Sequence, residues 1–69
     1  MMTILRFDAV DRDRPERDIG GVWIDPTKIC MLRPHPINAN YTIVTFGLND
    51  ACVKLSVDEL LNRIQTPGI

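Results

Sequence analysis

The stretch YTIVTFGLNDACVKLS, residues 41–56, decides the fold. Apolar and β-branched residues alternate with polar ones on both sides of a short polar turn, which predicts an antiparallel hairpin. Asn49 and Asp50 tolerate positive φ, so we expect them at the two central positions of the turn. Folding about that turn gives one apolar face, whose opposed pairs are Leu48 with Ala51, Phe46 with Val53, and Val44 with Leu55.

The next segment, SVDELLNRIQTPG at residues 56–68, has the period of a helix. Ser56 and Glu59 have the spacing of a capping box, and Thr66 begins a Thr-Pro-Gly stop. The apolar residues follow helical spacing along one stripe: Val57, Leu60, Leu61 and Ile64. We therefore predict a C-terminal helix over residues 57–66. It is too short to be stable alone, so it must dock on the sheet or on another chain.

Three β-rich segments precede the hairpin: TILRF (3–7), GVWIDP (21–26) and TKICMLR (27–33). The Asp25-Pro26 step predicts a bend or a bulge between the second and the third. In the third segment both faces are apolar, with Ile29 and Met31 on one side and Cys30 and Leu32 on the other. This pattern predicts a strand buried between two layers or at a subunit contact.

A charged stretch, DAVDRDRPERDIGG, fills residues 8–21. Its acidic side chains alternate with arginines, and such residues satisfy each other in water rather than in a core. We therefore expect a mobile charged loop over 8–21. The acids at 8, 11 and 13 lack the ligand spacing of a calcium-binding loop.

These segments together predict an α+β fold, a small antiparallel sheet of four or five short strands with one C-terminal helix. The chain has 69 residues, which suits a single domain over 1–69. Its apolar fraction of 45% and charged fraction of 25% are those of a folded domain rather than a disordered one.

The charge balance gives no field that would draw the chain to nucleic acid or anionic lipid, since eight basic residues meet nine acidic ones. No apolar run approaches the roughly 20 residues that cross a bilayer, and the N-terminus lacks the long apolar region of a secretory signal. We therefore expect a cytoplasmic protein without a membrane partner.

The sequence contains none of the common catalytic or phosphate-binding motifs. A nucleophile would have to be Cys30 or Cys52 activated by His35, the only histidine. An extended chain separates Cys30 from His35 by roughly 16 Å, and the three residues together leave a zinc site one ligand short. We expect no enzyme and no cofactor, with a Cys/His metal or thiol site as a second alternative.

The histidine lies in LRPHPINAN, residues 32–40. Pro34 and Pro36 favour extended backbone before them, and each removes one donor from a strand ladder. We expect a stiff, exposed linker that ends its strand and prevents edge-to-edge pairing. The functional alternative is that this stiffness presents Arg33 and His35 to a partner at low entropic cost.

From residue 22 to 66 the chain resembles the small FlbD/SwrD-type flagellar and swarming-motility proteins, and similar short bacterial and phage proteins. The shared pattern is WIDPTKI, YTIVTF, GLND and CVKL, followed by the capped helix SVDELLNRI. Five residues match the family's closing segment: Ser56, Asp58, Glu59, Leu60 and Arg63. The charged stretch, RPHP and LND depart from the family pattern. The resemblance implies a small, non-enzymatic accessory protein.

We therefore expect an interaction or regulatory protein that self-associates through its sheet and helix, with a further protein partner that the sequence does not identify. A short chain with open sheet edges buries more surface by pairing with a copy of itself. The alternative is a nucleic-acid-binding module built on Trp23, Lys28, Arg33 and Lys54. The predicted interaction surface consists of Trp23, Lys28, Cys30, Leu32, Arg33 and His35.

Overall fold

Five strands and one helix make up the computed structural model, which describes residues 4–65. In chain order the elements are β1 (Leu5–Val10), β2 (Asp18–Ile24), a 3-10 turn (Pro26–Lys28), β3 (Ile29–Pro34), β4 (Thr42–Phe46), β5 (Asn49–Val53) and α1 (Val57–Gln65). The α+β class and the single C-terminal helix are as predicted. The expected helix end at Thr66 and the start of the first strand at Thr3 lie outside the described residues.

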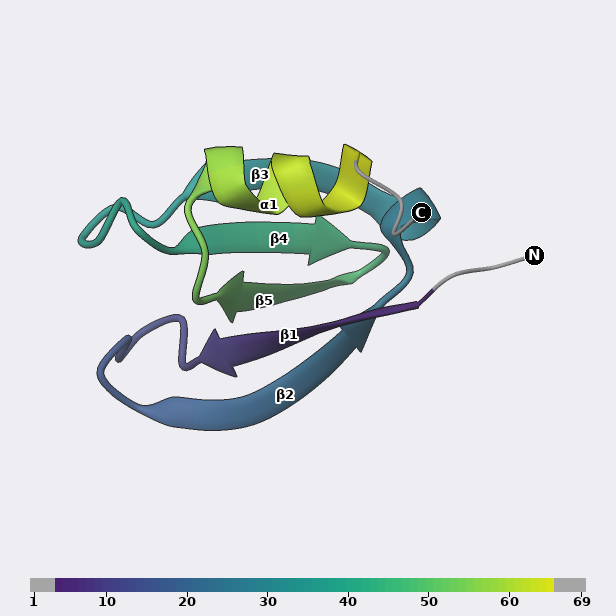
Figure 1. Cartoon of the computed structure of the whole chain (residues 1–69). Helices are drawn as coiled ribbons and strands as arrows, with labels where there is room; N and C mark the ends of the chain where they lie inside the picture. The colour runs from purple at the N-terminus through teal and green to yellow at the C-terminus, as the bar shows by residue number, and fades with distance from the viewer. Residues whose placement is uncertain (1–3, 66–69) are drawn as a thin grey trace.

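The strands form one antiparallel sheet in the order β2-β1-β5-β4-β3. Every pair of neighbours is also consecutive in the chain except β1 and β5, which bring the start and the end of the sheet together (Figure 1). The two edge strands, β2 and β3, are joined only through residues 25–28. The sheet therefore curves, because so short a connection must link its two opposite edges.

The hairpin forms where the sequence predicts it, but its register differs from the prediction. Phe46 lies opposite Asn49 and Val44 opposite Ala51, so the two-residue turn is Gly47-Leu48. Gly47 has a φ of +63°, and no described non-glycine residue has positive φ. A turn with positive φ at its first central position is the type II′ hairpin turn that glycine favours. Leu48, expected on the apolar face, is instead fully exposed at the turn.

The charged loop is shorter than predicted. β1 continues to Val10 and β2 already begins at Asp18, so the loop covers residues 11–17 rather than 8–21. Asp8 is exposed between the buried Phe7 and Ala9, the alternation of a strand with one buried face. The charge at Asp8 therefore marks the outward side of β1 and does not end it.

The Asp25-Pro26 step forms a capped 3-10 turn. Asp25 Oδ1 accepts hydrogen bonds from the backbone N–H of Thr27 at 2.9 Å and from its hydroxyl at 2.7 Å. The Thr27 hydroxyl, followed by the Thr27 amide, lowers the pKa of Asp25. Proline suits the first position of such a turn because its missing N–H would have no partner there.

β3 is an edge strand, and the prediction that it is buried between two layers is wrong; the alternative, a subunit contact, stays a prediction. A bulge between Ile29 and Met31 puts Ile29 opposite Phe46 and Leu32 opposite Val44, so both contribute to the core. Cys30 and Met31 are exposed. The bulge breaks the strict alternation on which the prediction depended.

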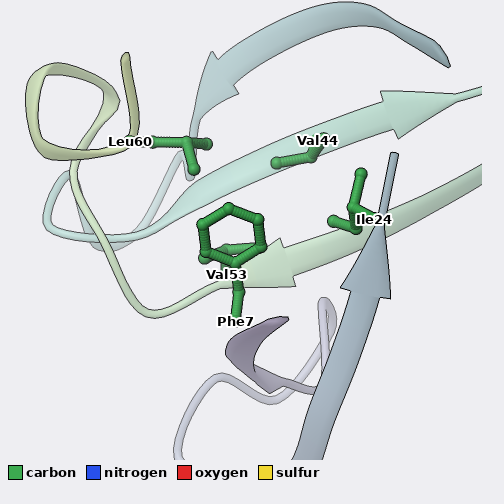
Figure 2. Packing of buried hydrophobic residues seen from close by; sticks show 5 residues of the cluster. All are labelled: Phe7, Ile24, Val44, Val53 and Leu60. Atoms are coloured by element: carbon green, nitrogen blue, oxygen red, sulfur yellow. The ribbon is translucent and has the colours of Figure 1, made fainter. Parts of the chain in front are cut away.

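The core lies between the sheet and α1. Its fully buried side chains come from four strands and the helix: Phe7, Ile24, Val44, Val53 and Leu60. Figure 2 shows Leu60 pointing from the helix toward the side chains of the strands. The helix begins with the predicted capping box, since the amide of Glu59 donates to Ser56 Oγ at 3.2 Å and the amide of Ser56 donates to Glu59 Oε1 at 3.1 Å. The hydrogen bond from the Ser56 amide, followed by one from the Ser56 side chain, lowers the pKa of Glu59.

Candidate functional site

The six residues of the predicted interaction surface do not form one site. Trp23 lies on the edge strand β2, whereas Cys30, Leu32 and Arg33 lie on the opposite edge strand β3. Leu32 faces the helix and packs on the core. The surface predicted from sequence therefore separates into two edges with different chemistry.

His35 is buried, with 4% of its surface exposed, so it is not presented to a partner. Its Nε2 lies 2.7 Å from the carbonyl oxygen of Arg12, and Nδ1 accepts from the amides of Ile37 at 3.1 Å and Asn38 at 3.4 Å. A carbonyl oxygen can only accept, so Nε2 carries the proton. Both ring nitrogens are therefore used to connect two loops. The segment ends β3 at Pro34 and is mostly exposed, as predicted for a linker, but His35 itself is buried.

The two connected loops are the charged loop, residues 11–17, and the proline loop, residues 35–41. The proline loop is closed by two backbone hydrogen bonds, from His35 N to Tyr41 O and from Tyr41 N to Asn38 O, both 3.0 Å long. The charged loop is tied to β5 by an ion pair between Arg12 and Asp50. His35 thus joins segments that are 23 residues apart.

A second buried set lies on the outer face of the sheet, which we define as the face opposite α1. Cys52 lies opposite Val10 on one side and Ile43 on the other, and all three are buried. Burial raises the pKa of the Cys52 thiol, which lowers its reactivity as a nucleophile at neutral pH. Cys52 is therefore packed among buried apolar side chains.

The metal alternative lacks a suitable ligand cluster. Across residues 4–65 no three side chains of the types His, Cys, Asp or Glu lie close enough to hold an ion. Cys30 is exposed on the β3 edge, with its thiol 3.6 Å from the carbonyl oxygen of Lys28, whereas Cys52 is buried. The two thiols and His35 therefore have different surroundings.

The basic residues of the nucleic-acid alternative are also spread over the sheet. Lys54 follows β5 and its Nζ lies 3.0 Å from Asp18 Oδ1. The hydrogen bond to Asp18, helped by the charge of that carboxylate, raises the pKa of Lys54. Lys28 ends the 3-10 turn before β3 and Arg33 lies near the end of β3, while Trp23 lies on β2.

The β2 edge carries an arrangement that sequence reasoning missed. Arg6 lies opposite Trp23 across β1 and β2, and its guanidinium carbon is 5.8 Å from the centre of the indole. A Cβ added to Gly21 would lie only 2.5 Å from Arg6 Nε, so the guanidinium lies directly over this glycine. Asp8 Oδ1 accepts from Arg6 Nη1 at 3.0 Å. The sequence signal for this contact is the glycine pair before Val22, because a glycine inside a strand often marks a place where another group comes close to the backbone.

Trp23 is the most exposed aromatic side chain of the described chain, at 66%, and Ile19 on the same strand is exposed at 54%. Isolated exposed apolar residues are common, but here both lie on a strand that has a free edge. The β2 edge, which we define as the free side of residues 18–24, is therefore the candidate functional site.

Within the described residues, no helix has the length and apolar character needed to cross a membrane. No protein-family model, no curated protein and no solved structure matches this chain. The function is therefore inferred from the geometry of the chain itself.

Proposed function

We propose that the chain is a small, non-enzymatic interaction protein that self-associates through its sheet. The observation that carries this proposal is the β2 edge. Among the described strands β2 pairs with β1 alone, and residues 19–24 contain neither a charged residue nor a proline. Proteins usually protect free edges with charges, prolines or bulges. The register irregularity between β1 and β2 lies at Ile19, so residues 20–24 that follow it form a regular edge without charge or proline, which is suited to strand pairing.

The opposite edge supports the choice of β2. β3 is interrupted by a bulge after Ile29 and ends with Arg33 and Pro34. Each of these features discourages the addition of another strand. Self-association through the sheet is therefore favoured at one edge and disfavoured at the other.

The non-enzymatic part of the proposal is supported by the state of the reactive groups. Backbone groups occupy both ring nitrogens of His35, and the thiol of Cys52 is buried. The resemblance of residues 22–66 to the FlbD/SwrD-type proteins favours the same class, because it implies a small accessory protein. The helix contributes little to association in this proposal, since Leu60 is used in the core of its own chain.

Static light scattering over a concentration series tests the proposal. The chain has a mass of 7.8 kDa, and we expect the measured mass to rise to a multiple of it at micromolar concentration. Trp23→Lys adds a charge at the centre of the β2 edge and should shift the chain toward the monomer. Leu48→Lys adds the same charge at the exposed hairpin turn and should leave association unchanged. A compact monomer at every concentration would refute self-association.

The same samples discriminate the nucleic-acid alternative. Single-stranded and duplex oligonucleotides are titrated at low salt, with Trp23 fluorescence as the signal. Binding that weakens steeply with salt, in a chain that stays monomeric, would favour the alternative over the proposal.

A further inference from the structure

We infer that the strand added at the β2 edge is β2 of a second copy, paired antiparallel about a two-fold axis at Val22. This inference rests on the proposed self-association and names the surface and register that it uses. It follows from three observations. Residues 20–24 carry no charge, the Arg6 guanidinium lies over Gly21, and Gly21 and Trp23 are two positions apart.

The charge pattern favours two copies of β2 over two copies of β3. Residues 19–24 are uncharged, so two β2 edges meet without like-charge repulsion. An antiparallel pair of β3 strands would bring Lys28 and Arg33 of one copy near Arg33 and Lys28 of the other. A pairing of β2 with β3 would be head-to-tail and would leave a free edge on each new copy.

Arg6 supplies a binding group at the β2 edge. Its guanidinium is held over Gly21 by the ring of Trp23 and the carboxylate of Asp8. The side chain of Arg6 nevertheless remains 53% exposed, so it can contact another aromatic ring. A guanidinium within about 6 Å of an aromatic face is attracted to the negative charge of the ring's π-system.

The two-fold register at Val22 provides that ring. It pairs residue i with residue 44 − i, so Trp23 of each copy lies opposite Gly21 of the other. Gly21 and Trp23 both lie on the outer face, because they pair with Asp8 and Arg6 while Val22 packs toward the core. The partner's Trp23 would therefore cover the glycine and reach the guanidinium above it.

The same register also explains why the partner should be a second copy. Trp23 lies two positions after Gly21 on the same strand, and Arg6 lies over that glycine. A single two-fold rotation therefore places the Trp23 of each copy opposite the Gly21 of the other. A one-residue shift would place Trp23 opposite Gly20, on the other face of the sheet. The β2 edge is therefore complementary to itself in one register.

Disulfide trapping tests the register in the full chain. All variants carry Cys30→Ser, which removes the exposed native thiol. In the proposed dimer the two copies of residue 22 face each other with Cα atoms about 4.5–5.5 Å apart, within the range of a disulfide. Val22→Cys should therefore form a covalent dimer under mild oxidation. Ile19→Cys, although more exposed, should not, because the two copies of residue 19 would be roughly 20 Å apart.

The outcomes separate this inference from the proposed function. If scattering shows an oligomer but Ile19→Cys is trapped as readily as Val22→Cys, the register is wrong and self-association stands. If the chain is monomeric throughout, both fail.

A second variant avoids any effect of the new thiol on folding. Trp23→Ala should weaken the dimer by about tenfold or more, whereas Leu48→Ala should leave it unchanged. An unchanged dissociation constant for Trp23→Ala would overturn the inference.

Discussion

Replacing His35 should destabilise the fold through two separable sets of hydrogen bonds. His35→Ala leaves three backbone groups without their partner: the carbonyl of Arg12 and the amides of Ile37 and Asn38. An unpaired buried polar group costs about 1–3 kcal/mol, and water entering the space left by the ring offsets part of this cost. We therefore expect a loss of about 2–3 kcal/mol in the free energy of unfolding. In a domain of this size, 1 kcal/mol lowers Tm by roughly 4–8 °C.

Two conservative variants divide this loss. The side-chain oxygen of His35→Asn can occupy the position of Nδ1 and accept from Ile37 and Asn38, but the side chain is too short to reach Arg12. The amide nitrogen of His35→Gln can occupy the position of Nε2 and donate to Arg12, without replacing the turn contacts. Each should retain part of the stability that His35→Ala loses.

Urea denaturation, followed by circular dichroism, measures these differences. Ile37→Ala is the matched control, because this side chain is 79% exposed and its backbone amide is retained. The reasoning fails if His35→Ala is as stable as Ile37→Ala, since the imidazole would then not connect the two loops.

Three further outcomes follow from the structure. Gly47→Ala should lose about 1 kcal/mol, because alanine is strained at a φ of +63°, whereas Leu48→Ala should be neutral in the same denaturation assay. Glu59 has a lowered pKa in the folded chain, so the stability that it adds is present above its unfolded pKa and is lost as pH falls below about 4.5. Glu59→Gln should therefore make the free energy of unfolding less dependent on pH in that range. In Cys30→Ser, Cys52 should react with a thiol reagent at least roughly tenfold more slowly than a free thiol; equal rates would contradict its burial.

The helix and the strands of the hairpin could be predicted because their signals are local. Ser56 and Glu59 are three residues apart and form the capping box without help from the rest of the chain. The hairpin register could not be predicted from residue preferences alone. Gly47 and the pair Asn49-Asp50 can both provide a turn, and the choice depends on which strand residues the sheet and helix bury.

The burial of His35 and the Arg6 contact at the β2 edge both depend on contacts between distant segments. The burial of His35 requires the carbonyl of Arg12, which lies 23 residues earlier in the chain. The contact of Arg6 with Trp23 requires the register of β1 on β2. Neither relation has a sequence spacing that would reveal it, so the sequence predicted Trp23 as an exposed contact and missed Arg6.

Amide hydrogen exchange at several protein concentrations tests the central claim most directly. Association through the β2 edge would protect amides of residues 20–24 that have no partner within the monomer. We predict that exchange in β2 slows as concentration rises, while exchange in β3 stays constant. Exchange in β2 that is independent of concentration, or protection that appears at β3 instead, would contradict the account.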